Sequence, residues 1–537
     1  MLLTRRQNLA LLAGAALAPM TGLRAAAPLA GTAPPRNPFL ADSNYPMGHG
    51  DSAQSDSTQL PGPTGPTRAL TSEEIRYHDL GVFNLGYLTS SPYADGKRVV
   101  WTNGSQFMTK FDHESFDVIA SLRIPGSAHT DTLAHENFLK TFDSDASFAE
   151  KYAAARQSGY PRIFGVYTLL DVDNQYVVCG DGQVELYGDS TPGDRLSSIV
   201  MRRMWKKPDT LPGGFIGIHM TFDGRIIVAT DQGYVIALTR DLQFIAAVRL
   251  PNAEAEIPSL PKGVGWIRNS FAVDEKGGIY VASSNDLHKV VWTGAKLSMD
   301  PKDGAWSERY SNSLGNGTGA TPTLMGFGDD PDKLVVLTDG DKLMNIVAFW
   351  RDDVPAGWRQ LRGAPSRRIA GMLPCNFGDP ALTAAQTEQS VVVTGYGMLI
   401  VNNEPRNIPA EILNDWVGKK TVIGYLNHLT QTQPFGTQKF IWDPAARKIR
   451  QAWVNREISS PNCVPYVSAT SNIVYFLGAR NNQFTLEGVD WTSGKSTFHY
   501  VIGGARFNNF YSQPIIDTGK RILYGGLYGA VRLQPKG

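Results

Sequence analysis

Two side chains stand out, by type and position, as candidates for acid–base and anion-binding chemistry. His219 lies in the mainly apolar run FIGIHMTF, where an imidazole can act as an acid, a base or a metal ligand. A hydrogen-bonded structural histidine is the alternative. Arg268, in IRNSFAV, offers a planar pair of donors that suits a carboxylate or an enolate, unless it is a solvent-facing arginine at a strand end. We predict His219 as the acid or base and Arg268 as the anion holder.

Polar residues also stand at the starts of several strand-rich units, each just before an apolar stretch. In a ring of such units these positions would line a central channel, where they could bind a small molecule or simply satisfy backbone groups. The candidate substrate-binding residues are Asn84, Tyr87, Asn269, Thr321, Asn376, Asp379, Asn462 and Asn508.

Metal binding and nucleophilic catalysis have weaker candidates, for which loop capping and solvated turns are the alternatives. The candidate metal ligands are His129, Asp131, His135 and Glu136 in AHTDTLAHENF and Asp329, Asp330 and Asp332 in GDDPD. Cys463 could be a nucleophile or a small buried apolar residue. The usual G-x-S-x-G, G-x-x-x-x-G-K and H-E-x-x-H motifs are missing from the sequence. The metal ligands therefore stay unassigned.

A short recurring unit indicates the scaffold that holds these residues. Each copy has an apolar stretch, a turn with Asp, Asn or Gly, a β-branched stretch and a second turn before another strand. The clearest copy, FIGIHMTFDGRIIVATDQGYVIAL, spans Phe215 to Leu238. Further copies begin near Phe83, Phe164, Ile267, Gly319, Asn376, Asn462 and Asn508. Units with two apolar faces must close into a ring, which predicts an all-β, eight-bladed β-propeller, with seven blades as the alternative.

The propeller is expected over residues 72–537, with a strand around Tyr77 to Val82 closing the ring against the last blade. Insertions near 127–159 and 403–420 interrupt the repeat. The run SFAEKYAAARQ in the first insertion predicts a helix, because it is rich in Ala, Glu and Lys and lacks internal Gly and Pro. Residues 28–71 are rich in Pro, Gly and Ser, and predict an extended tether, with a peptide wrapping the domain edge as the alternative.

Residues 1–27 have the anatomy of an export signal. Arg5 and Arg6 precede an apolar run from Leu9 to Ala18, and small residues at Ala25 to Ala27 suit cleavage. TRRQNL resembles the twin-arginine motif, although the residues after the arginine pair depart from it. We expect a periplasmic protein exported by the twin-arginine route, with ordinary secretion as the alternative.

The amino-acid composition narrows the range of binding partners that can be expected. The formal net charge is +1, so no nucleic acid partner is indicated, and after signal cleavage no apolar run is long enough to span a membrane. Cys179, Cys375 and Cys463 are far apart, and an odd number of cysteines excludes a complete disulfide framework. A small-molecule substrate is the expected partner, with a protein partner as the alternative.

Two runs resemble the D-x-x-x-G-K-x-x-W turn and strand of quinoprotein-type propellers. They are WDPAARKIRQAW, from Trp442 to Trp453, and VDWTSGKSTFHY, from Val489 to Tyr500. The resemblance implies the eightfold ring. Pyrroloquinoline-quinone dehydrogenases of that class carry two adjacent cysteines, a Ca²⁺ site and a central catalytic Asp, and this sequence has no adjacent cysteines and no matching positions for the other two. Pyrroloquinoline quinone and a divalent metal such as Ca²⁺ stay as candidate cofactors.

These observations together predict a periplasmic enzyme that acts on a small organic molecule at the mouth of the central channel. Oxidoreductase chemistry of the quinoprotein type is placed ahead of hydrolase, lyase or isomerase chemistry. The alternative is a non-catalytic binding or assembly propeller that presents its insertions to a protein partner.

Overall fold

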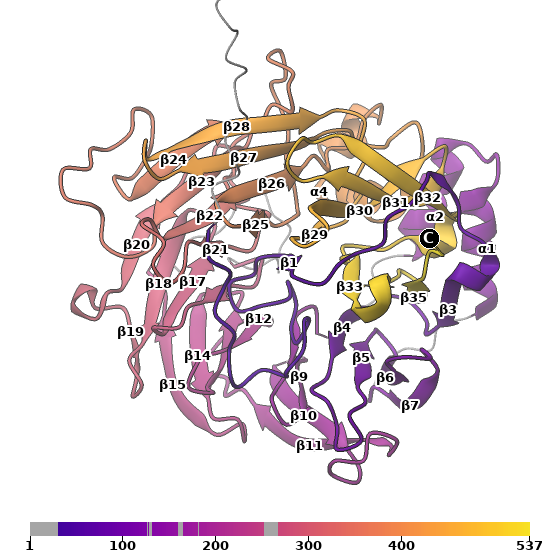
Figure 1. Ribbon diagram of the computed structural model, residues 1–537, viewed down its shortest axis with the longest axis horizontal. Helices are drawn as coiled ribbons and strands as arrows, with labels where there is room; N and C mark the ends of the chain where they lie inside the picture. The colour runs from indigo at the N-terminus through magenta and orange to yellow at the C-terminus, as the bar shows by residue number, and fades with distance from the viewer. Residues whose placement is uncertain are drawn as a thin grey trace, which may run out of the picture.

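The chain folds into a ring of β-sheets. A computed structural model describes residues 31–125, 127, 132–158, 165–180, 182–251 and 267–536. Within these residues the strands form eight sheets, each built on four strands, which surround one axis (Figure 1). The predicted eight-bladed propeller is therefore confirmed, and the seven-bladed alternative is wrong. No helix among the described residues has the length and apolar character needed to cross a membrane.

The first four blades follow one another along the chain. Blade 1 contains β4 (Leu85–Thr89), β5 (Val99–Asn103), β6 (Phe107–Asp112) and β7 (Val118–Arg123). Blade 2 contains β8 (Thr168–Leu170), β9 (Tyr176–Cys179), β10 (Gln183–Asp189) and β11 (Ile199–Lys206). Blade 3 contains β12 (Phe215–Met220), β13 (Ile226–Thr230), β14 (Tyr234–Leu238) and β15 (Phe244–Arg249). Blade 4 contains β16 (Ala272–Val273), β17 (Gly278–Ala282), β18 (Asp286–Trp292), β19 (Leu297–Ser298) and β20 (Trp306–Arg309).

The remaining blades complete the ring, and the last two borrow strands from the N-terminal region. Blade 5 contains β21 (Thr323–Met325), β22 (Leu334–Thr338), β23 (Asn345–Trp350) and β24 (Ile369–Pro374). Blade 6 contains β25 (Val392–Thr394), β26 (Gly397–Val401), β27 (Thr437–Asp443) and β28 (Lys448–Asn455). Blade 7 contains β29 (Tyr466–Ser468), β30 (Ile473–Arg480), β31 (Gln483–Asp490) and β32 (Ser496–Gly503), with β1 (Ser57–Thr58) and β2 (Arg68–Ala69) added in parallel. Blade 8 contains β33 (Ile515–Asp517), β34 (Arg521–Gly525), β35 (Gly529–Leu533) and β3 (Ile75–Asp79).

Blade 3 shows how the repeat unit makes a sheet. β-Branched residues fill β13, where every position is buried, because this strand is covered on both faces by the neighbouring blades. The turn between β12 and β13 contains Gly224 with a φ of +83°, a conformation that glycine adopts without steric cost. Aromatic side chains join one blade to the next, as where Trp101 of blade 1 stacks on Tyr176 of blade 2 with ring centroids 5.7 Å apart.

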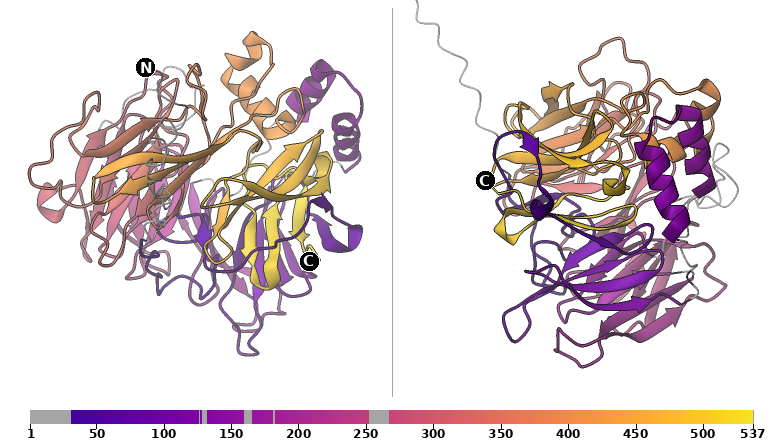
Figure 2. Two further views of the ribbon diagram at one scale, coloured as in Figure 1. Left: turned by 45° about the horizontal axis from the view of Figure 1, so that its top comes forward. Right: turned by 90° about the vertical axis from the view of Figure 1, so that its right-hand side faces the viewer.

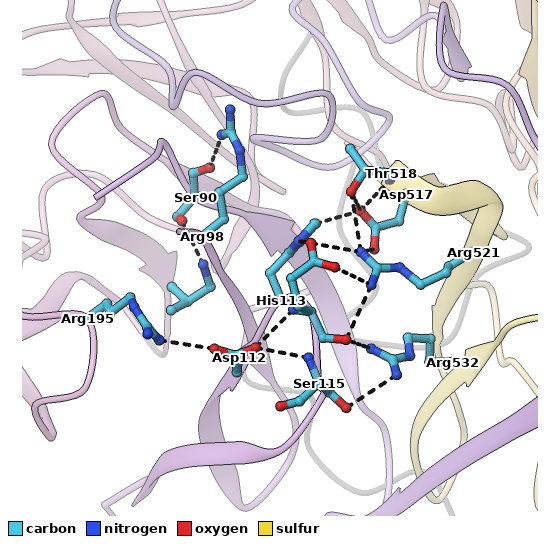
Figure 3. A network of polar contacts seen from close by, with 12 residues as sticks. Ser90, Arg98, Asp112, His113, Ser115, Arg195, Asp517, Thr518, Arg521 and Arg532 are labelled. Carbon is cyan, nitrogen blue, oxygen red and sulfur yellow. Dashed lines mark hydrogen bonds and ion pairs between the residues drawn. The ribbon is translucent and has the colours of Figure 1, made fainter. Parts of the chain in front are cut away.

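The ring closes where β3 pairs with β35 in antiparallel register, with Tyr77 opposite Val531. The predicted closing strand is therefore confirmed, with bounds a few residues earlier than expected. A polar network crosses the neighbouring junction between blades 8 and 1 (Figure 3). His113 Nε2 lies 2.5 Å from Asp517 Oδ1, and the guanidinium of Arg521 pairs with Asp517 and with Glu114, at 2.9 Å in each case. The ladder within blade 8 thus joins strands from opposite ends of the chain, and the ion pairs with Asp517 and Glu114 join blade 8 to blade 1.

Helical insertions stand above one face of the ring (Figure 2). They are α1 (Thr132–Asp143), α2 (Phe148–Ser158), α3 (Ala410–Leu413), α4 (Trp416–Thr421) and the π-helix η3 (Val422–Leu426). The short 3₁₀ helices are η1 (Ser72–Glu74), η2 (Pro301–Asp303), η4 (Ala505–Phe507) and η5 (Thr518–Lys520). The helix predicted in SFAEKYAAARQ is confirmed as α2, and its Ala155 packs in one apolar cluster with Leu426 of η3.

The N-terminal segment runs across the centre of the ring (Figure 1). We call residues 37–58 the N-terminal plug, because they hydrogen-bond to all eight blades. Each blade contributes at least one hydrogen bond from its inner strand: Thr89 to Tyr45, Leu170 to Ala41, Met220 to Asn37, Val273 to Ser52, Leu324 to Ala53, Val393 to Ser55, Val467 to Asp56 and Ile516 to Asn44. The tether interpretation of this region is wrong for the plug, whose backbone groups replace water at the inner strands.

Candidate functional site

A cavity of about 480 Å³ occupies the central channel. Its floor is the N-terminal plug, through Tyr45, Gly48 and His49. Helix α4 covers part of it, through Trp416, Val417 and Lys420. The walls come from the blades and are mainly apolar, with Leu85, Val166, Ile216, Val464 and Ile515 among them. A volume of this size fits a small organic molecule.

An aspartate–histidine pair lies in the floor of the cavity. His49 Nδ1 is 2.9 and 3.0 Å from the two carboxylate oxygens of Asp56, which is fully buried. Gln513 donates to Asp56, and the hydroxyl of Tyr45 donates to Gln513. Burial raises the pKa of Asp56, although His49 and Gln513 oppose the rise. This chain of bonds fixes the orientation of the imidazole.

The second ring nitrogen of His49 is available to a ligand. His49 lines the cavity, and within the described part of the chain its Nε2 atom makes no hydrogen bond. With Asp56 ionised, Nδ1 carries the hydrogen, and Nε2 is left as a proton acceptor. The ring also stacks on Tyr167, with centroids 6.2 Å apart. The arrangement is that of a general base held by a carboxylate.

The plug holds this pair in a strained backbone. His49, Gln54 and Asp56 have φ values of 63°, 61° and 56°, in the left-handed region that non-glycine residues seldom occupy. Each such residue costs on the order of 1–3 kcal/mol, so the surrounding hydrogen bonds must over-determine the conformation. The contacts of the plug to the blades provide that support.

A charged cluster lies in the same cavity, where blades 4 and 6 meet α4. Arg268 donates to Glu388 at 2.8 Å, and the ammonium of Lys420 pairs with the same carboxylate oxygen. Both cations pack on Trp416, at 4.8 Å for Arg268 and 4.7 Å for Lys420 from the ring centroid. Two positive groups therefore share one negative group at the cavity wall.

The charges of the cluster strongly affect the pKa values of Glu388 and Lys420. Burial opposes ionisation of Glu388, but Arg268 and Lys420 together lower its pKa to about 2. Burial also lowers the pKa of Lys420 to about 8, with Glu388 opposing the change and Arg268 adding to it. At neutral pH the cluster is therefore ionised, with a net charge of one positive unit.

The structure brings together three of the residues predicted from the sequence. Tyr87, Arg268 and Asn269 all line the cavity. Asn269 donates to the carbonyl oxygen of Thr318 at 3.1 Å, so its amide also supports the neighbouring loop. Burial raises the pKa of Tyr87 well above its ordinary value, so this phenol stays protonated.

His219 does not line the cavity. It is fully buried beneath the plug, where Nε2 lies 3.1 Å from the carbonyl oxygen of Ser52 and Nδ1 accepts from the Met220 N–H at 2.8 Å. Burial lowers its pKa to about 4. Both ring nitrogens serve the backbone, which is the structural alternative weighed above.

The other predicted substrate-binding residues bind backbone or sit in turns. Asn84 donates to Gly81, while Asn462 and Asn508 both donate to the carbonyl oxygen of Gly424 in η3. The Thr321 N–H donates to Ser390, a residue of the cavity wall. Asn376 and Asp379 cap a turn before β25, through bonds to Gly378 and Ala381, and are not among the lining residues of the cavity.

The candidate metal ligands are not gathered around a common point. His129 and Asp131 lie outside the described residues. The ring of His135 packs against that of Tyr528 in a tilted arrangement, and Glu136 pairs with Arg506. Asp330 accepts from Thr32 and Phe327, and Asp332 accepts from Trp442. No group of three or more His, Cys, Asp or Glu side chains in the described ranges is placed to hold a metal ion.

The residues of the cavity do not fit the quinoprotein arrangement. All three cysteines are free, and Cys463 is fully buried with its thiol donating to the carbonyl oxygen of Val464. Burial raises the pKa of this thiol, which disfavours a nucleophilic role. Glu388, which lines the cavity, is already held by two cations, and Asp56, which lies buried behind His49, is held by its imidazole. We therefore derive no step through a quinone or a Ca²⁺ ion.

Sequence reasoning missed five residues that make the site, namely His49, Asp56, Glu388, Trp416 and Lys420. Two lie in the segment interpreted as a tether, and two lie in the insertion expected near 403–420, to which no site residue was assigned. The signal that could have found the first pair is a histidine between glycines, followed by two aspartates, in MGHGDSAQSD, which is unusual in a flexible linker. Glu388 has no comparable signal.

Comparisons with known proteins agree with the fold. No family model matches the chain. An uncharacterized protein from Archaeoglobus fulgidus is 30% identical over 511 residues, which cover 93% of this chain and 89% of that protein. Among solved structures, the quinohemoprotein alcohol dehydrogenase from Comamonas testosteroni matches with a TM-score of 0.52 at 12% identity, over 94% of this chain and 82% of that one. One from Pseudomonas putida HK5 matches with a TM-score of 0.49 at 11% identity, over 91% and 79%.

Proposed function

We propose that this chain, which belongs to the same family as the Archaeoglobus fulgidus protein, is an enzyme that acts on a small organic molecule by proton transfer in the central cavity. The observation that carries the proposal is the His49–Asp56 pair, whose free Nε2 atom is available to the cavity. In this proposal His49 is the general base. Asp56 is a positioning residue that acts through it.

The geometry suggests a role for each of these groups in the proposed reaction. His49 Nε2 takes a proton from the bound molecule, and the imidazolium that forms is stabilised by the Asp56 carboxylate at Nδ1. Tyr45 and Gln513 keep that carboxylate in place. A positioned base of this kind contributes about 10²- to 10⁴-fold in rate.

Lyase or isomerase chemistry suits the rest of the cavity best. Removing a proton next to a carbonyl or carboxylate group leaves negative charge on the substrate, and the cavity already presents Arg268 and Lys420 to negative charge. Oxidoreductase chemistry is the second candidate. It is favoured by the fold shared with a quinohemoprotein alcohol dehydrogenase, and removing the proton of a hydroxyl group would again need a base.

We place the enzyme in the periplasm, exported through the twin-arginine route. This part of the proposal rests on Arg5, Arg6 and the apolar run that follows. Fusion of residues 1–30 to a reporter that is active only after folded export tests it. Loss of export when Arg5 and Arg6 are both changed to Lys is expected, and export that survives the change contradicts the twin-arginine assignment.

The test of the base uses wild type, His49→Gln, Asp56→Asn and the control His78→Gln. His78 bonds to the carbonyl oxygen of Phe116 and is not among the residues lining the cavity. A library of small carbonyl, hydroxy and carboxylate compounds is incubated with each protein in D₂O, and proton NMR follows both deuterium incorporation and net conversion.

We expect wild type and His78→Gln to exchange or convert the same compounds. His49→Gln should lose about 10²- to 10⁴-fold of that rate, and Asp56→Asn should also lose activity. An His49→Gln protein as active as wild type would contradict the proposal, as would a library in which wild type exchanges and converts nothing. Conversion of alcohols to carbonyl compounds that requires an added artificial electron acceptor, such as phenazine methosulfate, would favour oxidoreductase chemistry over lyase or isomerase chemistry.

A further inference from the structure

We infer that Arg268 and Lys420, packed on Trp416, form a subsite for the carboxylate of a substrate that is a monoanion with an apolar body. This inference rests on the proposed function, because it names the class of molecule that reaches His49. It also stands on features of the cavity that are separate from the histidine.

The first feature is a surplus of hydrogen-bond donors. A guanidinium has five N–H donors and an ammonium has three. Arg268 donates to Glu388 and to the carbonyl oxygen of Asn316, and Lys420 donates to Glu388. The remaining donors of both side chains have no acceptor among the described residues. Donors of buried cations are stabilised by acceptors, and a carboxylate offers two oxygens that match the planar arginine fork.

The second feature is the charge balance. Arg268, Lys420 and Glu388 are largely buried, with 12%, 20% and 20% of each side chain exposed. Two positive groups and one negative group leave one positive charge unbalanced within this cluster, which faces a cavity with mainly apolar walls. Uncompensated charge in such surroundings is costly, and a single negative charge on the ligand would neutralise it. A dianion would leave negative charge in excess.

The third feature is the apolar path into the cavity. Val166 and Val417 line the cavity and remain 46% and 36% exposed, so they mark its opening. Leu85, Val464 and Ile515 continue the apolar surface on the blade walls. A molecule that crosses this surface with one charged end leaves its apolar body between the opening, the charged cluster and His49.

The test measures binding of 3-phenylpropionate and of its neutral partner, 3-phenylpropan-1-ol, by isothermal titration calorimetry at pH 7. The proteins are wild type, Lys420→Met, Glu388→Gln, His49→Gln and the control Lys419→Met. Lys419 pairs with Glu404 at 2.7 Å and is not among the lining residues of the cavity, so it matches Lys420 in type and position along α4. Thermal melting checks that each variant is folded.

Wild type and Lys419→Met should bind the acid at least about tenfold more tightly than the alcohol, because bonds to charged groups are the strong ones. Lys420→Met should lose most of that preference. Glu388→Gln should bind the acid about threefold to tenfold more tightly, because it removes the competing carboxylate. Raising the pH through about 8, where Lys420 loses its proton, should weaken binding of the acid to wild type.

Lys420→Met should weaken binding of the acid and Glu388→Gln should strengthen it. Damage to the fold would instead weaken binding in both variants. The inference is overturned if wild type does not prefer the acid, if Lys420→Met keeps the preference, or if Glu388→Gln binds the acid more weakly than wild type. His49→Gln should keep the preference within about twofold. If His49→Gln loses proton exchange but still prefers the acid, the carboxylate subsite is supported independently of the base. If wild type exchanges protons but does not prefer the acid, the subsite is rejected and the proposed base is not.

Discussion

Asp51 should make docking of the N-terminal plug depend on pH. Its carboxylate accepts from the Ala53 N–H at 2.8 Å and from Ser55, and it lines a second cavity of about 580 Å³ on the plug. Burial raises its pKa from 3.8 to about 6, with the bonds from Ser55 and Ala53 opposing the rise and Asp56 adding to it. The folded state therefore holds this proton more tightly than the unfolded state does.

The sign and the size of the pH effect on stability follow from the difference between the folded and the unfolded pKa of Asp51. A group whose pKa is raised in the folded state stabilises the fold below its unfolded pKa and loses that contribution as the pH rises through its folded pKa. For Asp51 the loss lies between about pH 4 and pH 6. Roughly two pKa units correspond to about 3 kcal/mol, reduced by the share of the side chain that stays exposed. The substitution Asp51→Asn removes the titration and keeps one oxygen that can accept from Ala53.

The assay is the free energy of unfolding in urea, or the melting temperature if unfolding is irreversible, at pH 4 and pH 7.5. Relative to wild type, Asp51→Asn should gain about 2–3 kcal/mol between the two pH values. Asp209→Asn, at an exposed position, serves as the control and should show no such gain. An effect of Asp51→Asn that is the same at both pH values would refute the reasoning.

Two further predictions concern the junction between blades 1 and 8. Burial opposes protonation of His113, but Asp517 and Glu114 outweigh it and raise its pKa, so its contribution to stability is present below about pH 6.5 and lost as the pH rises through the raised value. Melting curves should therefore show His113→Gln less stable than wild type at pH 6, with the difference shrinking by pH 9; a constant difference would contradict the assignment. Arg521→Met removes one partner of a buried ion pair, with 5% and 1% of the two side chains exposed, and should cost about 3 kcal/mol in urea unfolding. Arg36→Met removes an exposed pair with Asp42 and should cost less than about 1 kcal/mol; equal costs would argue against a role for burial.

The ring was predictable because the blades repeat local signals. Hairpin turns such as the one at Gly224, and apolar runs such as β13, recur at the spacing of a blade, and each depends on neighbouring residues. The closing strand was also predictable, since a ring of blades needs a partner for β35. The insertion helix α2 has the composition of a helix in any context.

The plug and the site were less predictable for a physical reason. The contacts of Ala41, Tyr45, Ser52 and Ala53 to the blades are made by backbone groups, which every residue type carries, so composition does not reveal them. Polarity at the blade starts was visible, but asparagines such as Asn462 use it to bind backbone carbonyls. His49 and Asp56 are close in sequence, but Gln513, which donates to Asp56, comes from the far end of the chain. Arg268, Glu388 and Lys420 also meet from distant segments, and no local pattern encodes these meetings.

The hydrogen bond between Tyr45 and Gln513 joins positions 468 residues apart, so we expect the site to form late during folding. Contacts of such long sequence separation carry a large loop-closure cost and follow local hairpin formation during folding. A molecule that has lost its eighth blade, through misfolding or proteolysis, also loses Gln513 and the strand that closes the ring. Activity at His49 would therefore require a fully assembled ring. Molecules that lack the eighth blade would be inactive as well as unstable.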